Sequence, residues 1–162
     1  MKRVVIGLFF ILSIATGRLF GQTNLTLLGS LNYNNYLSDV WGYTKDNGDE
    51  LALVTTVNGF SVVDVSNPEV PNEIFYKASA KPDTWWRDVK TWDKYAYVVS
   101  EATDGLYIVD LEQIPGTIQE TFFFGDNYPF TKAHNIFIDE NGIRSEEHTS
   151  ELQSPCNLVC RL

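Results

Sequence analysis

The feature that most constrains this chain is a unit of short strands that occurs twice and begins a third time. The segment Gly59–Asp64 (Gly-Phe-Ser-Val-Val-Asp) recurs at residues 105–110 (Gly-Leu-Tyr-Ile-Val-Asp), and Asp39 with its following Val recurs as Asp88 with its following Val. Matching residues lie about 46 positions apart, between the periods of WD40 and kelch repeats. A repeat of this length predicts stacked units that bury their apolar faces against one another.

Each unit predicts four short strands, because runs of β-branched and aromatic residues alternate with Gly, Asn, Asp and Pro turn signals. The expected strands are residues 38–43, 51–57, 60–65 and 73–76 in the first unit, 87–92, 95–100, 106–111 and 121–124 in the second, and 134–138 at the start of a third. Four strands per unit are typical of β-propeller blades. A solenoid or a β-sandwich is the structural alternative.

The predicted fold class is therefore all-β, a β-propeller fragment with about two four-stranded blades and the start of a third. Residues 24–33 also predict a strand, and residues 25–31 within it resemble the fourth strand of a unit. In a complete ring this strand would pair with the last blade and remove an open sheet edge.

The N-terminus has the pattern of a secretory signal peptide. A basic start at residues 1–3 precedes an apolar run at residues 4–15, and small residues follow. The run is shorter than the roughly 20 residues of a spanning helix, although a retained membrane anchor is the alternative. We predict a signal peptide at residues 1–21 and a protein that is secreted or held at the cell surface, with no membrane insertion after cleavage.

The C-terminal residues 144–162 have a different character from the repeats. Residues 144–154 and 157–162 match, codon by codon, the translation of a short-read sequencing adapter. We interpret residues 144–162 as an artefactual, non-native tail and expect the natural protein to continue beyond residues 22–143, the partial propeller. In this interpretation His148, Cys156 and Cys160 carry no functional information.

The chain is acidic, with a formal net charge of −9. This balance argues against nucleic acid and anionic membranes as partners, because their phosphates repel an acidic surface. A solvated acidic surface explains the composition. A site for a divalent cation is the sharper alternative, because carboxylates and carbonyls are the ligands that Ca²⁺ prefers.

The candidate ligand or metal residues lie at the starts of the first strands. Asp39 and Asp88 occupy equivalent positions, and Asn135 takes the same position in the third unit. First strands line the central channel of a propeller, so the three side chains can form a ring of oxygen ligands for Ca²⁺. His134 is the one histidine outside the tail and cannot alone form a transition-metal site. Hydrogen bonding between blades is the structural interpretation of these residues.

Other repeated residues predict architecture. Gly59 and Gly105 open the third strands, and Asp64 and Asp110 end them, where each Asp can accept hydrogen bonds from nearby turn amides. We expect Arg87 to form a local ion pair with the neighbouring Asp. The four tryptophans predict packing between blades, with an aromatic ligand platform as the alternative: Trp41, Trp85, Trp86 and Trp92.

The quoted Gly-Leu-Tyr-Ile-Val-Asp and Gly-Phe-Ser-Val-Val-Asp segments resemble LVIVD repeats. The longer strings at residues 38–43, 86–90, 96–101 and 133–137 resemble the choice-of-anchor B family. These are exported bacterial proteins with a propeller-like LVIVD domain and a C-terminal surface anchor. The resemblance implies a secreted or cell-surface location and carries no defined reaction.

Two functions follow as hypotheses. The first is a monomeric binding or scaffold module for an extracellular protein or glycan. The second is a propeller enzyme, a hydrolase or lyase, whose metal at the channel mouth is completed by residues beyond this sequence. No Gly-rich phosphate loop, nucleophile elbow or His-Glu-x-x-His motif is present.

Overall fold

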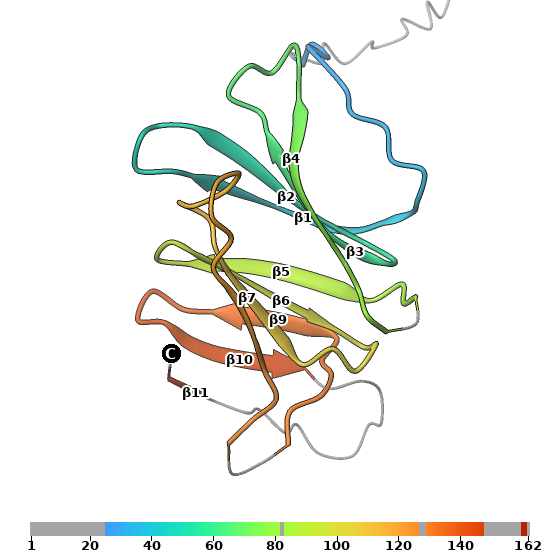
Figure 1. Cartoon of the computed structure of the whole chain (residues 1–162), viewed down its shortest axis with the longest axis vertical. Helices are drawn as coiled ribbons and strands as arrows, with labels where there is room; N and C mark the ends of the chain where they lie inside the picture. The colour runs from blue at the N-terminus through green and yellow to red at the C-terminus, as the bar shows by residue number, and fades with distance from the viewer. Residues whose placement is uncertain (1–24, 82, 127–128, 148–159, 162) are drawn as a thin grey trace, which may run out of the picture.

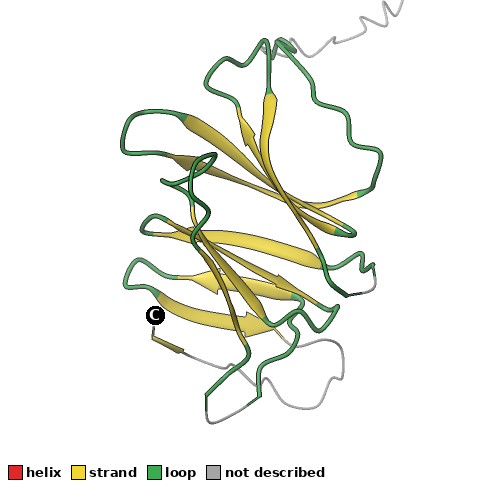
Figure 2. Cartoon of the chain, in the orientation of Figure 1, coloured by secondary structure: helices red, strands yellow, loops and turns green. Residues whose placement is uncertain are grey.

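The computed structural model describes residues 25–81, 83–126, 129–147 and 160–161. Within these residues the chain forms strands joined by loops, with no helix (Figure 2). The predicted all-β class is confirmed. The predicted signal peptide lies outside the described residues. Within the described part, no helix is long and apolar enough to cross a membrane.

The first unit is a four-stranded antiparallel sheet whose strands follow one another in chain order. Its strands are β1 (Leu37–Thr44), β2 (Glu50–Thr56), β3 (Gly59–Asp64) and β4 (Asn72–Ala78). Thr56 pairs with Gly59, so a two-residue turn joins β2 to β3. Such a turn holds adjacent strands in one fixed register.

The second unit repeats this order in a separate sheet. Its strands are β5 (Arg87–Trp92), β6 (Tyr95–Ser100), β7 (Leu106–Asp110) and β8 (Glu120–Phe123). Trp92 pairs with Tyr95, and Asp93 between them has φ of 53°. A positive φ matches the twist of a tight hairpin, and Asp tolerates it better than most residues. The predicted bounds of β5 and β6 agree with the structure.

A third sheet begins with β9 (Asn135–Ile138), followed by β10 (Ile143–Glu147) and β11 (Cys160–Arg161). β10 crosses residue 144, where the sequence loses the character of the repeats. The turn before Ile143 returns the chain along β9, where residues 144–147 pair with residues 135–138. Backbone pairing requires no apolar alternation, so a polar segment can extend the strand.

The three sheets are stacked along the long axis of the molecule (Figure 1). One apolar core lies between the first two blades, and a second lies between the second blade and the third sheet. Blade 1 contributes Leu53 and Val62 to the first core, while blade 2 contributes Val89 and Val98. The second blade is thus covered on both faces, which explains its nearly continuous apolar strands.

The predicted N-terminal strand is not a strand in the structure. Residues 25–33 have no regular secondary structure, and Leu25 and Leu27 are 88% and 84% exposed. The segment touches blade 1 through a hydrogen bond between the Tyr33 hydroxyl and Ser61 Oγ, at 2.8 Å. A strand requires a neighbouring backbone to pair with, and none of the described strands pairs with residues 25–33.

Candidate functional site

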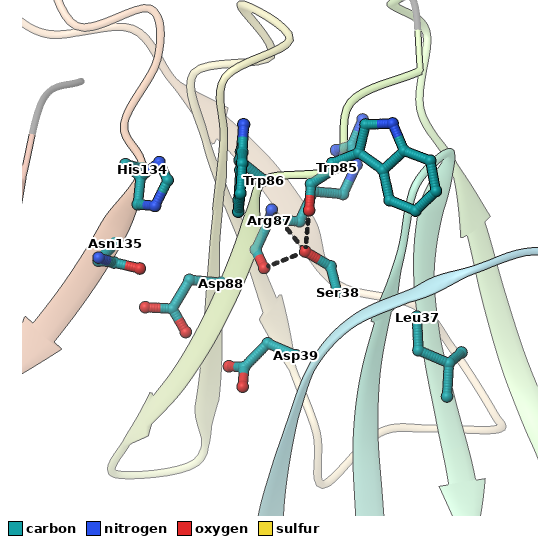
Figure 3. A pocket seen from close by; sticks show the side chains of 9 residues that line it. All are labelled: Leu37, Ser38, Asp39, Trp85, Trp86, Arg87, Asp88, His134 and Asn135. Atoms are coloured by element: carbon teal, nitrogen blue, oxygen red, sulfur yellow. Dashed lines mark hydrogen bonds between the residues drawn. The ribbon is translucent and has the colours of Figure 1, made fainter. Parts of the chain in front are cut away.

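The candidate site is an open pocket at the N-terminal ends of the first strands. β1, β5 and β9 lie side by side, although they are far apart in the sequence. Their first residues surround a volume of about 560 Å³ together with the segment that precedes β5 (Figure 3). The lining residues are Leu37, Ser38, Asp39, Trp85, Trp86, Arg87, Asp88, His134 and Asn135. All four candidate residues from the sequence, Asp39, Asp88, His134 and Asn135, therefore line one pocket.

The two aspartates link each first strand to the next. Asp39 Oδ2 accepts a hydrogen bond from the amide of Val89 at 3.3 Å, and Asp88 Oδ2 accepts one from the amide of Ile136 at 2.8 Å. In each bond the carboxylate belongs to one unit. The amide belongs to the next unit, one residue after the position that is equivalent to the aspartate. A buried amide without a partner is costly, so these bonds help to hold neighbouring blades together.

The Lys90 ammonium lies between the two carboxylates. Its Nζ is 3.2 Å from Asp39 Oδ2, 2.5 Å from Asp88 Oδ1 and 2.9 Å from the carbonyl oxygen of Val89. The same ammonium lies 4.7 Å from the centroid of the Trp41 ring. A side-chain cation thus occupies the place between the carboxylates that Ca²⁺ would need.

A calcium site at this position stays a prediction that the geometry does not support. The described residues include no group of three or more His, Cys, Asp or Glu side chains placed to hold a metal ion. Asp39 and Asp88 are already engaged by Lys90 and by backbone amides. A Ca²⁺ ion would have to displace these partners.

The two carboxyl groups differ in their acidity. Burial raises the pKa of Asp88, the hydrogen bond with Asp39 raises it further, and Lys90 offsets only part of this rise. Burial also tends to raise the pKa of Asp39, but hydrogen bonds with Asp88 and Lys90 outweigh it and leave that pKa below its usual value. The pair therefore has one readily ionised member and one that holds its proton more strongly.

His134 faces the pocket from the start of the third unit. Its Nδ1 lies 2.7 Å from Glu101 Oε1, and its ring lies against Trp86 at an interplanar angle of 37° with centroids 4.8 Å apart. The ring therefore has a carboxylate on one side and an indole on the other. Asn135 lies beside His134 with its amide group toward the pocket (Figure 3). These contacts fix the imidazole in place without a metal.

Two tryptophans at the pocket are exposed, contrary to the prediction that they pack between blades. Trp85 and Trp86 are 57% and 51% exposed, and Trp85 contacts the Tyr36 ring at an interplanar angle of 43° with centroids 4.7 Å apart. Both precede β5, at the open end of the first strands. Trp41 contacts the next blade through a hydrogen bond, in which its Nε1 donates to Thr91 Oγ1 at 3.0 Å. The exposure of Trp85 and Trp86 favours the alternative interpretation, an aromatic ligand platform. The sequence signal for it was a pair of adjacent tryptophans just before a strand.

Ser38 is a pocket residue that sequence reasoning missed. Its Oγ accepts a hydrogen bond from the Arg87 amide at 2.9 Å and lies 2.7 Å and 2.9 Å from the carbonyl oxygens of Trp85 and Arg87. The serine thereby holds the backbone that carries the tryptophans (Figure 3). The one sequence feature that could have identified Ser38 as a pocket residue is its position directly before the repeated Asp-Val pair.

The predicted ion pair between Arg87 and its neighbour Asp88 was wrong. Successive side chains of a strand point to opposite faces, so the guanidinium of Arg87 lies away from the Asp88 carboxylate. Arg87 Nη1 instead pairs with Asp104 Oδ2 at 2.9 Å, and the two side chains are 5% and 11% exposed. Asp104 lies in the turn before β7, which no local pattern connects to Arg87.

The repeated Asp residues of the third strands form turn contacts. Asp64 Oδ1 accepts a hydrogen bond from the Ser66 amide at 2.9 Å, and Asp110 Oδ1 accepts one from the Glu112 amide at 3.0 Å. The hydrogen bonds with Ser66 hold the pKa of Asp64 below its usual value. Both residues lie away from the pocket and serve the architecture of the blades.

The repeated glycines are required by close contacts. Gly105 has φ of 74°, a conformation that favours glycine. At Gly59, a Cβ atom would lie 2.5 Å from the carbonyl oxygen of Lys77 in the paired strand β4. Any side chain at either position would therefore disturb the third strand of its blade.

Comparison with known protein families identifies the repeated unit. The model of the LVIVD repeat matches residues 51–76 and 86–111. The chain carries two LVIVD repeats. The first match covers β2, β3 and most of β4, and the second covers β5 to β7. No curated protein and no solved structure matches the chain. With their antiparallel four-stranded sheets, the LVIVD repeats here form a propeller-like module.

Proposed function

We propose that this protein is an exported binding module of the choice-of-anchor B kind, and that its pocket binds an extracellular glycan. The observation that carries the proposal is the pair of exposed indoles, Trp85 and Trp86, beside the carboxylates of Asp39 and Asp88 in one open pocket. The apolar start of the chain supports export. The resemblance of the longer motifs supports the family and, with it, a surface location.

The aromatic side of the pocket suits the flat apolar face of a sugar ring. Large amphipathic rings provide contact area with little loss of conformational freedom, since each has only two side-chain torsions. Contacts with Tyr36 and His134 hold the two indoles in position before any ligand arrives. Such preorganisation lowers the entropic cost of binding.

The polar side of the pocket suits hydroxyl groups. Carboxylates accept hydrogen bonds, whereas the amide of Asn135 and the imidazole of His134 offer both donors and acceptors. The volume of about 560 Å³ lies within the roughly 300–1,000 Å³ of small-ligand sites. The acidic composition supports neither nucleic acid nor an anionic membrane as the ligand.

The test is glycan binding by the full chain on an array, followed by calorimetry with the best binder. We expect Trp86→Ala to weaken binding by about tenfold or more, because an aromatic contact at the centre of a site is worth over 1 kcal/mol. Trp41→Ala is the matched control, since that indole lies on β1 outside the pocket lining. Unchanged affinity in a Trp85→Ala/Trp86→Ala variant would refute this site, and capture of proteins alone would favour a protein ligand.

A catalytic role is the second candidate, and the opposite pKa displacements of Asp39 and Asp88 favour it. Carboxyl pairs whose environments separate their pKa values are a common acid and base arrangement. A hydrolase would release new reducing ends from a bound glycan. We expect Asp88→Asn to abolish that release while glycan affinity changes little. Absence of products with a saturating glycan leaves the binding module as the function.

A further inference from the structure

A second cavity, of about 180 Å³, lies between the two complete blades. Its apolar wall includes Phe60 from β3, Val98 from β6, Tyr107 from β7 and Phe122 from β8. The three rings form one group, with the Tyr107 centroid 6.1 Å from Phe60 and 4.9 Å from Phe122. An apolar cavity of roughly 150 Å³ is large enough to bind benzene, so this one can hold a single ring.

One end of the cavity is polar and centres on Asp104. Its Oδ2 accepts hydrogen bonds from Ser79 Oγ at 2.8 Å, Arg87 Nη1 at 2.9 Å and Ser100 Oγ at 3.2 Å. All four side chains belong to residues that line the cavity. The Asp104 carboxylate joins the other three side chains in one hydrogen-bonded network, so the polar end of the cavity has a defined geometry.

The Arg87 guanidinium retains an unused donor at this end. Its side chain is 5% exposed, and Nη2 has no hydrogen-bond partner among the described residues. Buried nitrogen donors are nearly always paired. An oxygen atom brought in by a ligand would complete the guanidinium, whereas none of the described protein groups does so.

The charges around the cavity are already balanced. Asp104 neutralises Arg87, and Lys77 pairs with Glu120 while its ammonium lies over the Tyr107 and Phe122 rings. A charged ligand would therefore bring an uncompensated charge into a largely apolar space, which is costly. A neutral ligand with one oxygen meets no such cost.

We propose that this cavity binds a neutral compound with a single ring and a hydroxyl group, of the phenol type. The ring packs against Phe60, Tyr107 and Phe122, and the hydroxyl oxygen accepts a hydrogen bond from Arg87 Nη2. The site is distinct from the glycan pocket, to which Arg87 presents backbone atoms held by Ser38 (Figure 3). It does not depend on the proposed glycan binding.

The test is a titration of the full chain with phenol, followed by the methyl resonances of Val98. We expect saturable shifts with a dissociation constant of about 1 mM or below, a realistic affinity for so small a ligand. Methyl resonances of Ile136, in the other core, serve as the internal reference. Toluene lacks the oxygen and benzoate carries a charge, so we expect each to bind about tenfold more weakly.

The variant that tests the location is Ala78→Phe. Ala78 is exposed and lines the cavity at the end of β4, so a larger side chain there closes the space with little effect on the core. Thr121→Phe, on the exposed part of β8, is the matched control. We expect the first to abolish the Val98 shifts and the second to preserve them.

Three results would overturn the proposal. Absence of Val98 shifts in the unsubstituted chain up to the solubility of phenol would exclude the site, whatever the stability of the variant. Equal affinities for phenol and toluene would show that Arg87 Nη2 does not donate a hydrogen bond to the ligand. Phenol binding by a folded Ala78→Phe variant at unchanged affinity would place the ligand elsewhere.

Discussion

The two complete blades share one strand order, yet their first strands differ in burial. Val89 in β5 is fully buried, while its repeat equivalent Val40 in β1 is 62% exposed. The difference follows from the neighbours, because β5 lies between β1 and β9 whereas β1 contacts β5 alone among the described first strands. Equivalent positions of the repeat therefore share the same backbone conformation, whereas the number of stacked neighbours decides how much of each side chain is exposed to solvent.

The largest expected difference between the blades is at the position before the repeated aspartate, which is Ser38 in β1 and Arg87 in β5. Arg87→Met leaves the Asp104 carboxylate buried without its cation, and we expect a loss of about 3–5 kcal/mol in unfolding free energy. Ser38→Ala removes hydrogen bonds at a half-buried site and should cost about 1 kcal/mol. Urea unfolding followed by tryptophan fluorescence measures both.

The control for this prediction is the double variant Arg87→Met/Asp104→Leu. Removing both charges of a buried pair is far less costly than removing one, so much of the lost stability should return. Equal losses for Ser38→Ala and Arg87→Met would show that the buried ion pair does not distinguish the blades.

The second difference concerns apolar packing at Val40 and Val89. Val89→Ala removes two methyl groups from the core between the blades and leaves a cavity, so we expect a loss of about 2–3 kcal/mol. Val40→Ala should change stability by about 0.5 kcal/mol or less, because the side chain is largely solvated. Thermal unfolding of the two variants provides the comparison, and a large loss at Val40 would reveal an additional partner on that face.

The smallest difference is in the acidity of the equivalent carboxyls, which carbon NMR of the side chains can follow. The pKa of Asp39 is lowered, so its ionised form contributes stability above about pH 3.9, and this is lost as pH falls through the folded value. The pKa of Asp88 is raised, so its contribution has the opposite slope: stability decreases as pH rises from about 3.9 through the folded value. We expect two titrations on opposite sides of the usual pKa.

The variant Lys90→Met tests the cause of this difference in acidity. Lys90 favours the charged form of both carboxyls by hydrogen bonding and by charge, so its removal should raise the pKa of Asp39 and the pKa of Asp88 together. Thr121→Phe, on β8, which does not pair with β5, should leave both titrations unchanged. If neither carboxyl responded to Lys90→Met, the ammonium would not lie between them.

The blades could be predicted from the sequence because each strand and turn is marked by residues within that strand or turn. Turn residues such as Gly105 and Asp93 require special backbone conformations, and the apolar runs between turns mark the strands. The prediction was wrong at residues 25–33, where an apolar run resembles a strand but pairs with none of the described strands. A strand needs a paired backbone, and a single sequence does not show which backbone lies beside it.

The candidate site was partly predictable for the same physical reason. The repeat placed Asp39, Asp88 and Asn135 at equivalent positions, so their gathering at one end of the first strands followed from stacking. The partners of those side chains did not follow. The contact of Lys90 with Asp39 depends on how the first two blades are placed, and the contact of Arg87 with Asp104 depends on the fold of the turn before β7. Strand patterns in the sequence encode neither.

The bonds from Asp39 to the amide of Val89 and from Asp88 to the amide of Ile136 have a consequence for how such chains can grow. Each link runs from one blade to the next in the same sense, so the interface is heterologous and its repetition produces a ring or an open superhelix. A tandem duplication copies both the acceptor and the donor of every junction. Lengthening the gene by whole units therefore preserves the fit between neighbours without compensating substitutions.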